Sequence, residues 1–228
     1  MKKLITIAVF AIFSASSAIS ASLTPVVGLS YNNAGFAGEG HEHAYSETGV
    51  SDGTTSEYGA FADQYASIFL ELEIGDIFAL GVDYVPGDIA SPKNVSREGT
   101  TGTEHPSAGA SSVQVDFQAL TTVYAKVNVP FLGGAYIKGG YHNVSVIVNE
   151  SMDSGNTYKD TDTEGYMAAV GYNHDLGSNG LSIRAEVGAM QFDDVKADNG
   201  QGASGNLNKI QVESMWGARG TISVVKSF

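Results

Sequence analysis

The chain has 228 residues, a formal net charge of −13 and no cysteine. Without cysteine there is no thiol catalysis, cysteine-ligated zinc or iron–sulfur chemistry. The acidic balance argues against nucleic acid as a partner, because binding to phosphates requires a basic surface. The 28 glycines and 10% aromatic residues are typical of an all-β domain and not of a disordered chain.

The N-terminus has the features of a secretory signal peptide. A basic start at Met1-Lys2-Lys3 is followed by an apolar run over 4–13 and by small residues up to Ala21. The alternative is a membrane anchor, but the apolar run is shorter than the roughly 20 residues that a spanning helix needs. We therefore expect residues 1–21 to be removed on export and residues 22–228 to form one domain. No later segment is apolar for long enough to be a transmembrane helix.

Apolar and polar residues alternate in eight segments, as in strands with one apolar and one polar face. The clearest segment has Val113, Val123 and Val127 on one face and Gln114 and Lys126 on the other. The predicted strands cover about 24–36, 62–74, 77–86, 112–129, 134–148, 164–174, 181–192 and 209–228. Their connections alternate between long and short, which is typical of a membrane barrel with short periplasmic turns and long outer loops. The pattern predicts an all-β fold, an eight-stranded antiparallel up-and-down transmembrane β-barrel.

If the apolar faces point outward, ten charged side chains point into the barrel. Both signs are present, so these side chains can pair, whereas a soluble sandwich would have to bury them in its core at high cost. Side chains just fill the interior of an eight-stranded barrel, so we expect a plugged lumen. The expected lumen charges are Glu71, Glu73, Asp83, Asp116, Lys126, Lys138, Arg184, Glu186, Glu213 and Arg219.

Aromatic residues near the ends of the predicted strands are expected to form girdles at the two membrane interfaces. The alternative is the aromatic core of a soluble sandwich. The residues are Tyr31, Phe36, Phe78, Tyr84, Phe131, Tyr141, Tyr166, Tyr172 and Phe228.

The last alternating segment ends on an aromatic residue, Phe228. A terminal aromatic on such a strand resembles the signal that the barrel-assembly machinery reads in bacterial outer-membrane barrels. Lys226 stands where that signal often has another aromatic residue, although a lysine can extend to the interface. By strand count, alternation and terminal aromatic, the chain resembles the small eight-stranded outer-membrane barrels of the OmpA-barrel, OmpX and opacity-protein class. The resemblance covers essentially all of 22–228 and implies a monomer in contact with outer-membrane lipid and lipopolysaccharide.

The expected function is non-enzymatic, a structural or surface-interaction role through long acidic outer loops. One alternative is a narrow porin-like channel for small solutes, and another is a soluble exported β-sandwich that acts as a binding module. Catalysis is not expected, because neither His142 nor His174 has an obvious nucleophile beside it in the sequence. No cofactor is expected.

Two features are candidate cation sites. His41 and His43, with Glu39 and Glu42, have donors suited to Zn²⁺ or Cu²⁺, and His105 is a possible further ligand. The alternative is a solvated polar loop. The acidic segments suit Ca²⁺ or Mg²⁺, bound directly or as bridges to lipopolysaccharide, against the alternative of a solvated, self-repelling loop. Their carboxylates are Glu39, Glu42, Glu47, Asp52 and Glu57 in segment 37–60 and Asp153, Asp160 and Asp162 in segment 149–164.

Overall fold

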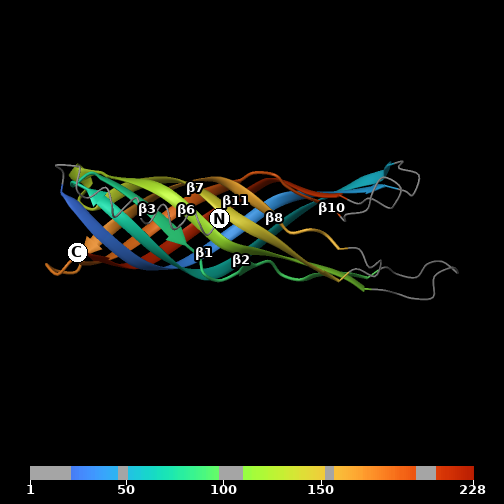
Figure 1. The fold of residues 1–228 in the computed structure, drawn as a ribbon, viewed down its shortest axis with the longest axis horizontal. Helices are drawn as coiled ribbons and strands as arrows, with labels where there is room; N and C mark the ends of the chain where they lie inside the picture. The colour runs from blue at the N-terminus through green and yellow to red at the C-terminus, as the bar shows by residue number, and fades with distance from the viewer. Residues whose placement is uncertain (1–21, 46–50, 98–109, 152–156, 199–208) are drawn as a thin grey trace.

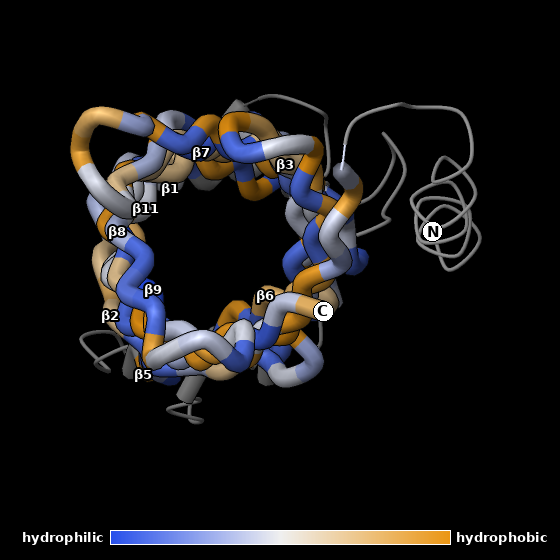
Figure 2. The backbone as a smooth tube through the Cα atoms, turned by 90° about the vertical axis from the view of Figure 1, so that its left-hand side faces the viewer, coloured by the Kyte–Doolittle hydropathy of each residue, from blue (hydrophilic) through white to orange (hydrophobic). Residues whose placement is uncertain are grey.

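The eight alternating segments form a closed ring of antiparallel strands (Figures 1 and 2). The computed structural model describes residues 22–45, 51–97, 110–151, 157–198 and 209–228, so the expected signal peptide lies outside the described residues. The first and last strands close the ring through a ladder that runs from Val26↔Ser227 to His43↔Lys209. Pairing around the whole circle confirms the predicted barrel and contradicts a sandwich of two open sheets.

The ring consists of eight strands, with three short strands attached to it. The ring strands are β1 (Leu23–Tyr45), β2 (Ser51–Ile74), β3 (Phe78–Tyr84), β6 (Ala110–Asn128), β7 (Ala135–Ser151), β8 (Thr161–Asp175), β9 (Leu181–Phe192) and β11 (Lys209–Ser227). The short strands β4 (Ile89–Ala90) and β5 (Asn94–Arg97) pair with β6, and β10 (Val195–Asp198) pairs with β11. In the described part of the chain, no helix is long and apolar enough to cross a membrane.

The short connections gather at one end of the barrel, together with the C-terminus (Figure 1). One of them contains the 3₁₀ helix η2 (Pro130–Leu132) and turns back through Gly133 and Gly134, which have positive φ angles of 51° and 105°. A side chain at Gly134 would also place its Cβ 2.4 Å from the carbonyl oxygen of Asn173. Glycine is therefore required here both by backbone conformation and by close approach.

The opposite end differs from the prediction, because the strands continue far into the expected loops. β1 and β2 have 23 and 24 residues, so most of the expected loop 37–61 is strand. The wall divides there into two tongues that splay apart (Figure 1). The first tongue contains β1, β2, β10 and β11, and the second contains β4, β5, β6 and β7. Among the described residues no ladder joins the two tongues, since β2 pairs with β3 only over 68–74.

Two β-bulges reverse the faces of β6 and β11 where these strands enter the tongues. They contain Ala119, with φ 55°, and Ser214, with φ 51°. The extra residue changes the side-chain phase, so Phe117 and Val212 point inward although both were expected on the outer face. The predicted alternation over 112–129 is thus correct after Ala119 and wrong for the residues before it, which belong to the tongue. The reversal places apolar residues inside the tongues and polar residues outside them.

Candidate functional site

The outer wall is apolar along the half of the barrel that carries the short turns. Leu29, Val187 and Ile222 point outward from β1, β9 and β11, and each side chain is more than 60% exposed. Exposed aromatic residues border this band, with Tyr31, Tyr141, Tyr166 and Trp216 toward the tongues and Phe78, Phe131, Tyr172 and Phe228 toward the turns. An apolar belt between two aromatic girdles matches the core and the interfaces of a bilayer.

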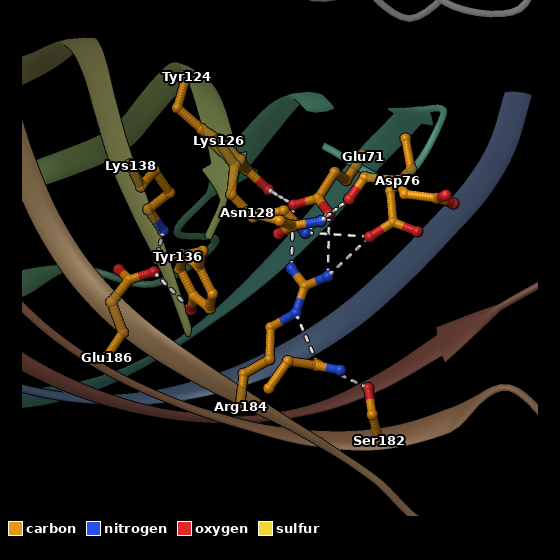
Figure 3. Close-up of polar contacts among 12 residues, drawn as sticks. Glu71, Asp76, Tyr124, Lys126, Asn128, Tyr136, Lys138, Ser182, Arg184 and Glu186 are labelled. Carbon is orange, nitrogen blue, oxygen red and sulfur yellow. Dashed lines mark hydrogen bonds and ion pairs between the residues drawn. The ribbon is translucent and has the colours of Figure 1, made fainter. Parts of the chain in front are cut away.

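Inside this half, Glu71 on β2 is the centre of a buried ion network (Figure 3). Its carboxylate accepts hydrogen bonds from Lys126 Nζ at 2.6 Å and from Nη1 and Nη2 of Arg184, both at 2.9 Å. The Tyr124 hydroxyl donates another at 3.0 Å, and Glu73 lies 3.0 Å from Lys126 Nζ. A fully buried carboxylate with this many donors is well compensated for its lost hydration.

Glu186 on β9 is the centre of a second group of polar contacts beside the first (Figure 3). It lies 2.6 Å from Lys138 Nζ and 3.4 Å from Arg219 Nη2, and it accepts a hydrogen bond from the Tyr136 hydroxyl at 3.1 Å. Lys138 Nζ also lies 4.7 Å from the centre of the Tyr124 ring, which joins the two groups. Together they connect strands on opposite sides of the ring.

The structure brings eight of the ten expected lumen charges together. Glu71, Glu73, Asp83 and Glu186 are acidic and Lys126, Lys138, Arg184 and Arg219 are basic, so the formal charges cancel. Asp116 and Glu213 were expected inside as well, but they lie on the outer wall because they follow the reversed phase of the two bulges. Asp116 accepts a hydrogen bond from Asn149 Nδ2 at 2.6 Å, and Glu213 lies 3.8 Å from His41 Nε2.

A charged interior inside an apolar outer wall is the inverse of a water-soluble protein. In the half of the ring that carries the apolar band, each strand is hydrogen-bonded to both of its neighbours, so the wall there can face hydrocarbon without an open sheet edge. The chain is a small outer-membrane β-barrel. In outer-membrane barrels the short turns lie on the periplasmic side and the long loops outside the cell, which is the orientation expected for the short turns and the tongues of this chain.

Comparisons with known proteins found similarity to solved structures alone. No family model matches the sequence, and no curated protein matches it either. The outer-membrane protein OprG of Pseudomonas aeruginosa is a similar structure, with a TM-score of 0.49 and 14% identity over 87% of this chain and 95% of that one. The outer-membrane protease OmpT of Escherichia coli has a TM-score of 0.45 and 9% identity over 89% and 97%. The outer-membrane protein AlkL has a TM-score of 0.43 and 13% identity over 88% and 90%.

An apolar cleft of about 410 Å³ lies between the two tongues. Gly59 and Phe61 of β2 and Val212 of β11 line it from the first tongue, and Val115 of β6 and Val146 of β7 line it from the second. This cleft was not predicted from the sequence, because most of its wall belongs to segments expected to be loops. A volume of this size is within the range of small-molecule sites.

Phenylalanine rings form the floor of the cleft. Phe61 stacks on Phe36 with ring centroids 5.1 Å apart and on Phe117 at 6.0 Å, and Phe192 continues the layer at 6.2 Å from Phe117. Phe36 is 3% exposed, so its expected place in the interface girdle is wrong. This buried aromatic layer separates the cleft from the ion network below it.

The expected histidine site lies on the outer surface of the first tongue. His41 Nε2 is 3.8 Å from carboxylate oxygens of Glu39 and Glu213, and its Nδ1 is 2.8 Å from Ser56 Oγ. Among the described residues no group of three histidine, aspartate or glutamate side chains is arranged to hold a metal ion. The side chains of Glu42 and His43, like His105, lie outside the described residues. On the same surface, a hydrogen bond to Glu39 and the charge of that carboxylate raise the pKa of the Tyr58 phenol.

The C-terminal aromatic lies at the turn end of the wall. The Phe228 side chain is exposed on the outside, and its backbone N–H donates to the Pro25 carbonyl at 3.1 Å. Lys226 Nζ lies 5.1 Å from the centre of the Phe228 ring and donates to the Ser227 carbonyl. Lys226 thus places its amino group at the end of the wall beside the terminal ring, which fits a lysine that extends to the interface.

Deleting Phe228 is expected to reduce assembly into the outer membrane, with export across the inner membrane intact. The deletion removes the exposed terminal ring and leaves the ion network unchanged. Heat-modifiable mobility of the folded barrel in isolated outer membranes measures the effect, and Phe131→Ala, another exposed ring at the turn end, is the control. An undiminished folded fraction in the deletion strain would contradict a role for Phe228 as the assembly signal.

Proposed function

We propose that this barrel is a non-enzymatic surface protein that binds small apolar molecules in the cleft between its tongues. The observation that carries the proposal is an apolar cleft of about 410 Å³ that lies outside the lipid-facing band. Exposed apolar surface of this kind is costly in water and commonly marks a binding site. The surface-interaction role expected from the sequence thus acquires a position and a class of ligand.

The arrangement of polar groups supports a binding role rather than catalysis. The described residues that line the cleft include no histidine, lysine or aspartate. His142 lies below the cleft with its ring 4.4 Å from that of Phe192, and its Nε2 has no hydrogen-bond partner in the described part of the chain. A histidine activates a nucleophile through such a hydrogen bond, so His142 does not activate one through Nε2 in this arrangement.

Packing of the lumen supports a closed barrel over the alternative of a narrow channel. The space left among Asp83, Lys138, Arg184 and their neighbours is about 10 Å³. A single water molecule needs about 10–15 Å³ on this scale. Solutes that enter the cleft therefore meet first the aromatic floor and then a filled ion network.

Binding is tested by titrating barrels in phosphatidylcholine nanodiscs with phenylnaphthylamine, a neutral apolar dye whose fluorescence increases in apolar sites. We expect saturable binding above the signal of empty nanodiscs. Val212→Asp, which places a charge in the cleft, should weaken binding about tenfold or more. Gln211→Asp is the matched control, because the adjacent side chain points to the opposite face of β11. Equal affinities for the two variants, or no saturable signal at all, would overturn the proposal.

A further inference from the structure

We infer that the cleft selects apolar molecules that carry one positive charge at the end, of the alkylammonium or arylalkylammonium class. This inference rests on the proposed function and names the ligand chemistry of the same cleft. It follows from the charge, the aromatic lining and the dimensions of the cleft.

A carboxylate, that of Glu57, lies at the opening of the cleft. Glu57 on β2 is the single charged side chain among the described residues that line it. Glu57 is exposed, and in the described part of the chain no basic side chain forms an ion pair with it. An unpaired carboxylate beside apolar surface attracts a cation and repels an anion, so fatty-acid carboxylates are disfavoured relative to amines of the same shape.

Aromatic rings add a second preference of the same sign. Phe36, Phe61 and Phe117 form the floor, and Tyr158 contributes to the wall. The faces of these rings carry negative electrostatic potential, which stabilises an organic cation and not an anion. The apolar body of the ligand packs against the same rings by burial of its surface.

The spacing of Glu57 and Phe61 indicates the shape of the ligand. Both lie on the inner face of β2, four residues apart, which corresponds to about 13 Å along a strand. A charged group held near Glu57 therefore needs an extended apolar tail to reach the aromatic floor. A compact cation such as ammonium or a single metal ion would leave the apolar floor exposed.

The outer surface of the tongues favours cations as well. Among the described residues of that half, the carboxylates outnumber the basic side chains. The carboxylates include Glu39, Asp116, Asp160, Asp162, Asp193, Asp194, Asp198 and Glu213, and the basic side chains are Lys93, Lys159, Lys196 and Lys209. An acidic surface around an opening raises the local concentration of cations and lowers that of anions.

The test compares octylammonium, octanol and octanoate, which share an eight-carbon tail and differ in the charge of the head group. Each probe is measured by its displacement of phenylnaphthylamine from barrels in phosphatidylcholine nanodiscs. Empty nanodiscs correct for partition into lipid. We expect octylammonium to bind about tenfold more tightly than octanol, and octanoate to bind more weakly than either. Glu57→Gln should weaken octylammonium about fivefold and leave octanol unchanged. Glu213→Gln is the matched control, because it removes one carboxylate of the outer surface of β11 and none from the cleft, and it should change octylammonium binding by less than about twofold and leave octanol unchanged.

The outcomes separate this inference from the proposed function. If octanol binds as tightly as octylammonium, or if Glu57→Gln and Glu213→Gln have equal effects, charge selection by the cleft is wrong while binding of apolar molecules stands. If none of the three probes displaces the dye and the dye itself does not bind, the proposed function fails and the inference fails with it.

Discussion

Replacing Glu71 by alanine is expected to destabilise the barrel by about 3–5 kcal/mol. The substitution removes the shared partner of Lys126 and Arg184 and leaves two cations in a dry interior with only Glu73 nearby. Unfolding in denaturant can be followed through the fluorescence of Trp216, the single tryptophan of the chain. Glu164→Ala, at an exposed position of β8, is the control and should change stability by less than about 0.5 kcal/mol.

A second substitution separates the loss of a salt bridge from simple loss of packing. In Glu71→Ala combined with Arg184→Met, one of the two stranded cations is gone, so the double variant should be more stable than Glu71→Ala alone. If the double variant is less stable than the single one, the cost lies in packing and not in unpaired charge.

In planar bilayers the wild-type barrel should carry no steady current, because its lumen is filled by the same network. A steady wild-type conductance would favour the channel alternative.

The lipid-facing half could be predicted because each of its strands keeps one side-chain phase. Alternation at period two places Leu29 and Ile222 outside and Glu71 and Arg184 inside without any knowledge of the ladder. The pairing of specific charges could not be predicted. Glu71 and Arg184 are separated by 113 residues, and their contact depends on the curvature and register of the closed ring.

The tongues and their cleft were missed because the sequence there has the composition of loops. Segment 37–61 is rich in glycine and acidic residues, which occur in turns as often as in exposed strands. Long strands form there because β1 and β2 pair with each other along their whole length as a hairpin that continues beyond the membrane band. The alternation of apolar and polar residues arises because one face of each strand contacts lipid. It is not maintained in the tongues, where the faces of the strands contact water or the neighbouring tongue.

The two bulges did leave a signal in the sequence. Leu120 and Met215 are apolar residues at positions that the alternation assigns to the polar face, and both are buried. Each stands next to the residue that takes the positive φ angle, Ala119 or Ser214. An apolar residue in the wrong phase inside a long alternating segment therefore indicates a bulge. This signal would have placed Phe117 and Val212 inside and Asp116 and Glu213 outside.

Val123→Arg is expected to destabilise the barrel in a bilayer by about 2–4 kcal/mol. Val123 points outward from β6 and is half-exposed, between the bulge at Ala119 and the end of the strand at Asn128. An arginine there places a charge in hydrocarbon unless the side chain reaches an interface. Equilibrium folding into phosphatidylcholine vesicles, followed by Trp216 fluorescence, measures the cost.

Thr122→Arg is the matched comparison, because Thr122 is the adjacent residue and is buried inside the barrel. Its cost comes from excess volume in a packed interior, which does not depend on the lipid. The cost of Val123→Arg should therefore fall in vesicles of short-chain lipid, where the guanidinium reaches the head groups more easily, while that of Thr122→Arg stays the same. If both variants respond equally to bilayer thickness, the assignment of the outer face of β6 is incorrect. A selective response of Val123→Arg would place the lipid-facing part of β6 after Ala119 in the sequence. The side-chain phase reverses at Ala119, and the water-exposed tongue begins there.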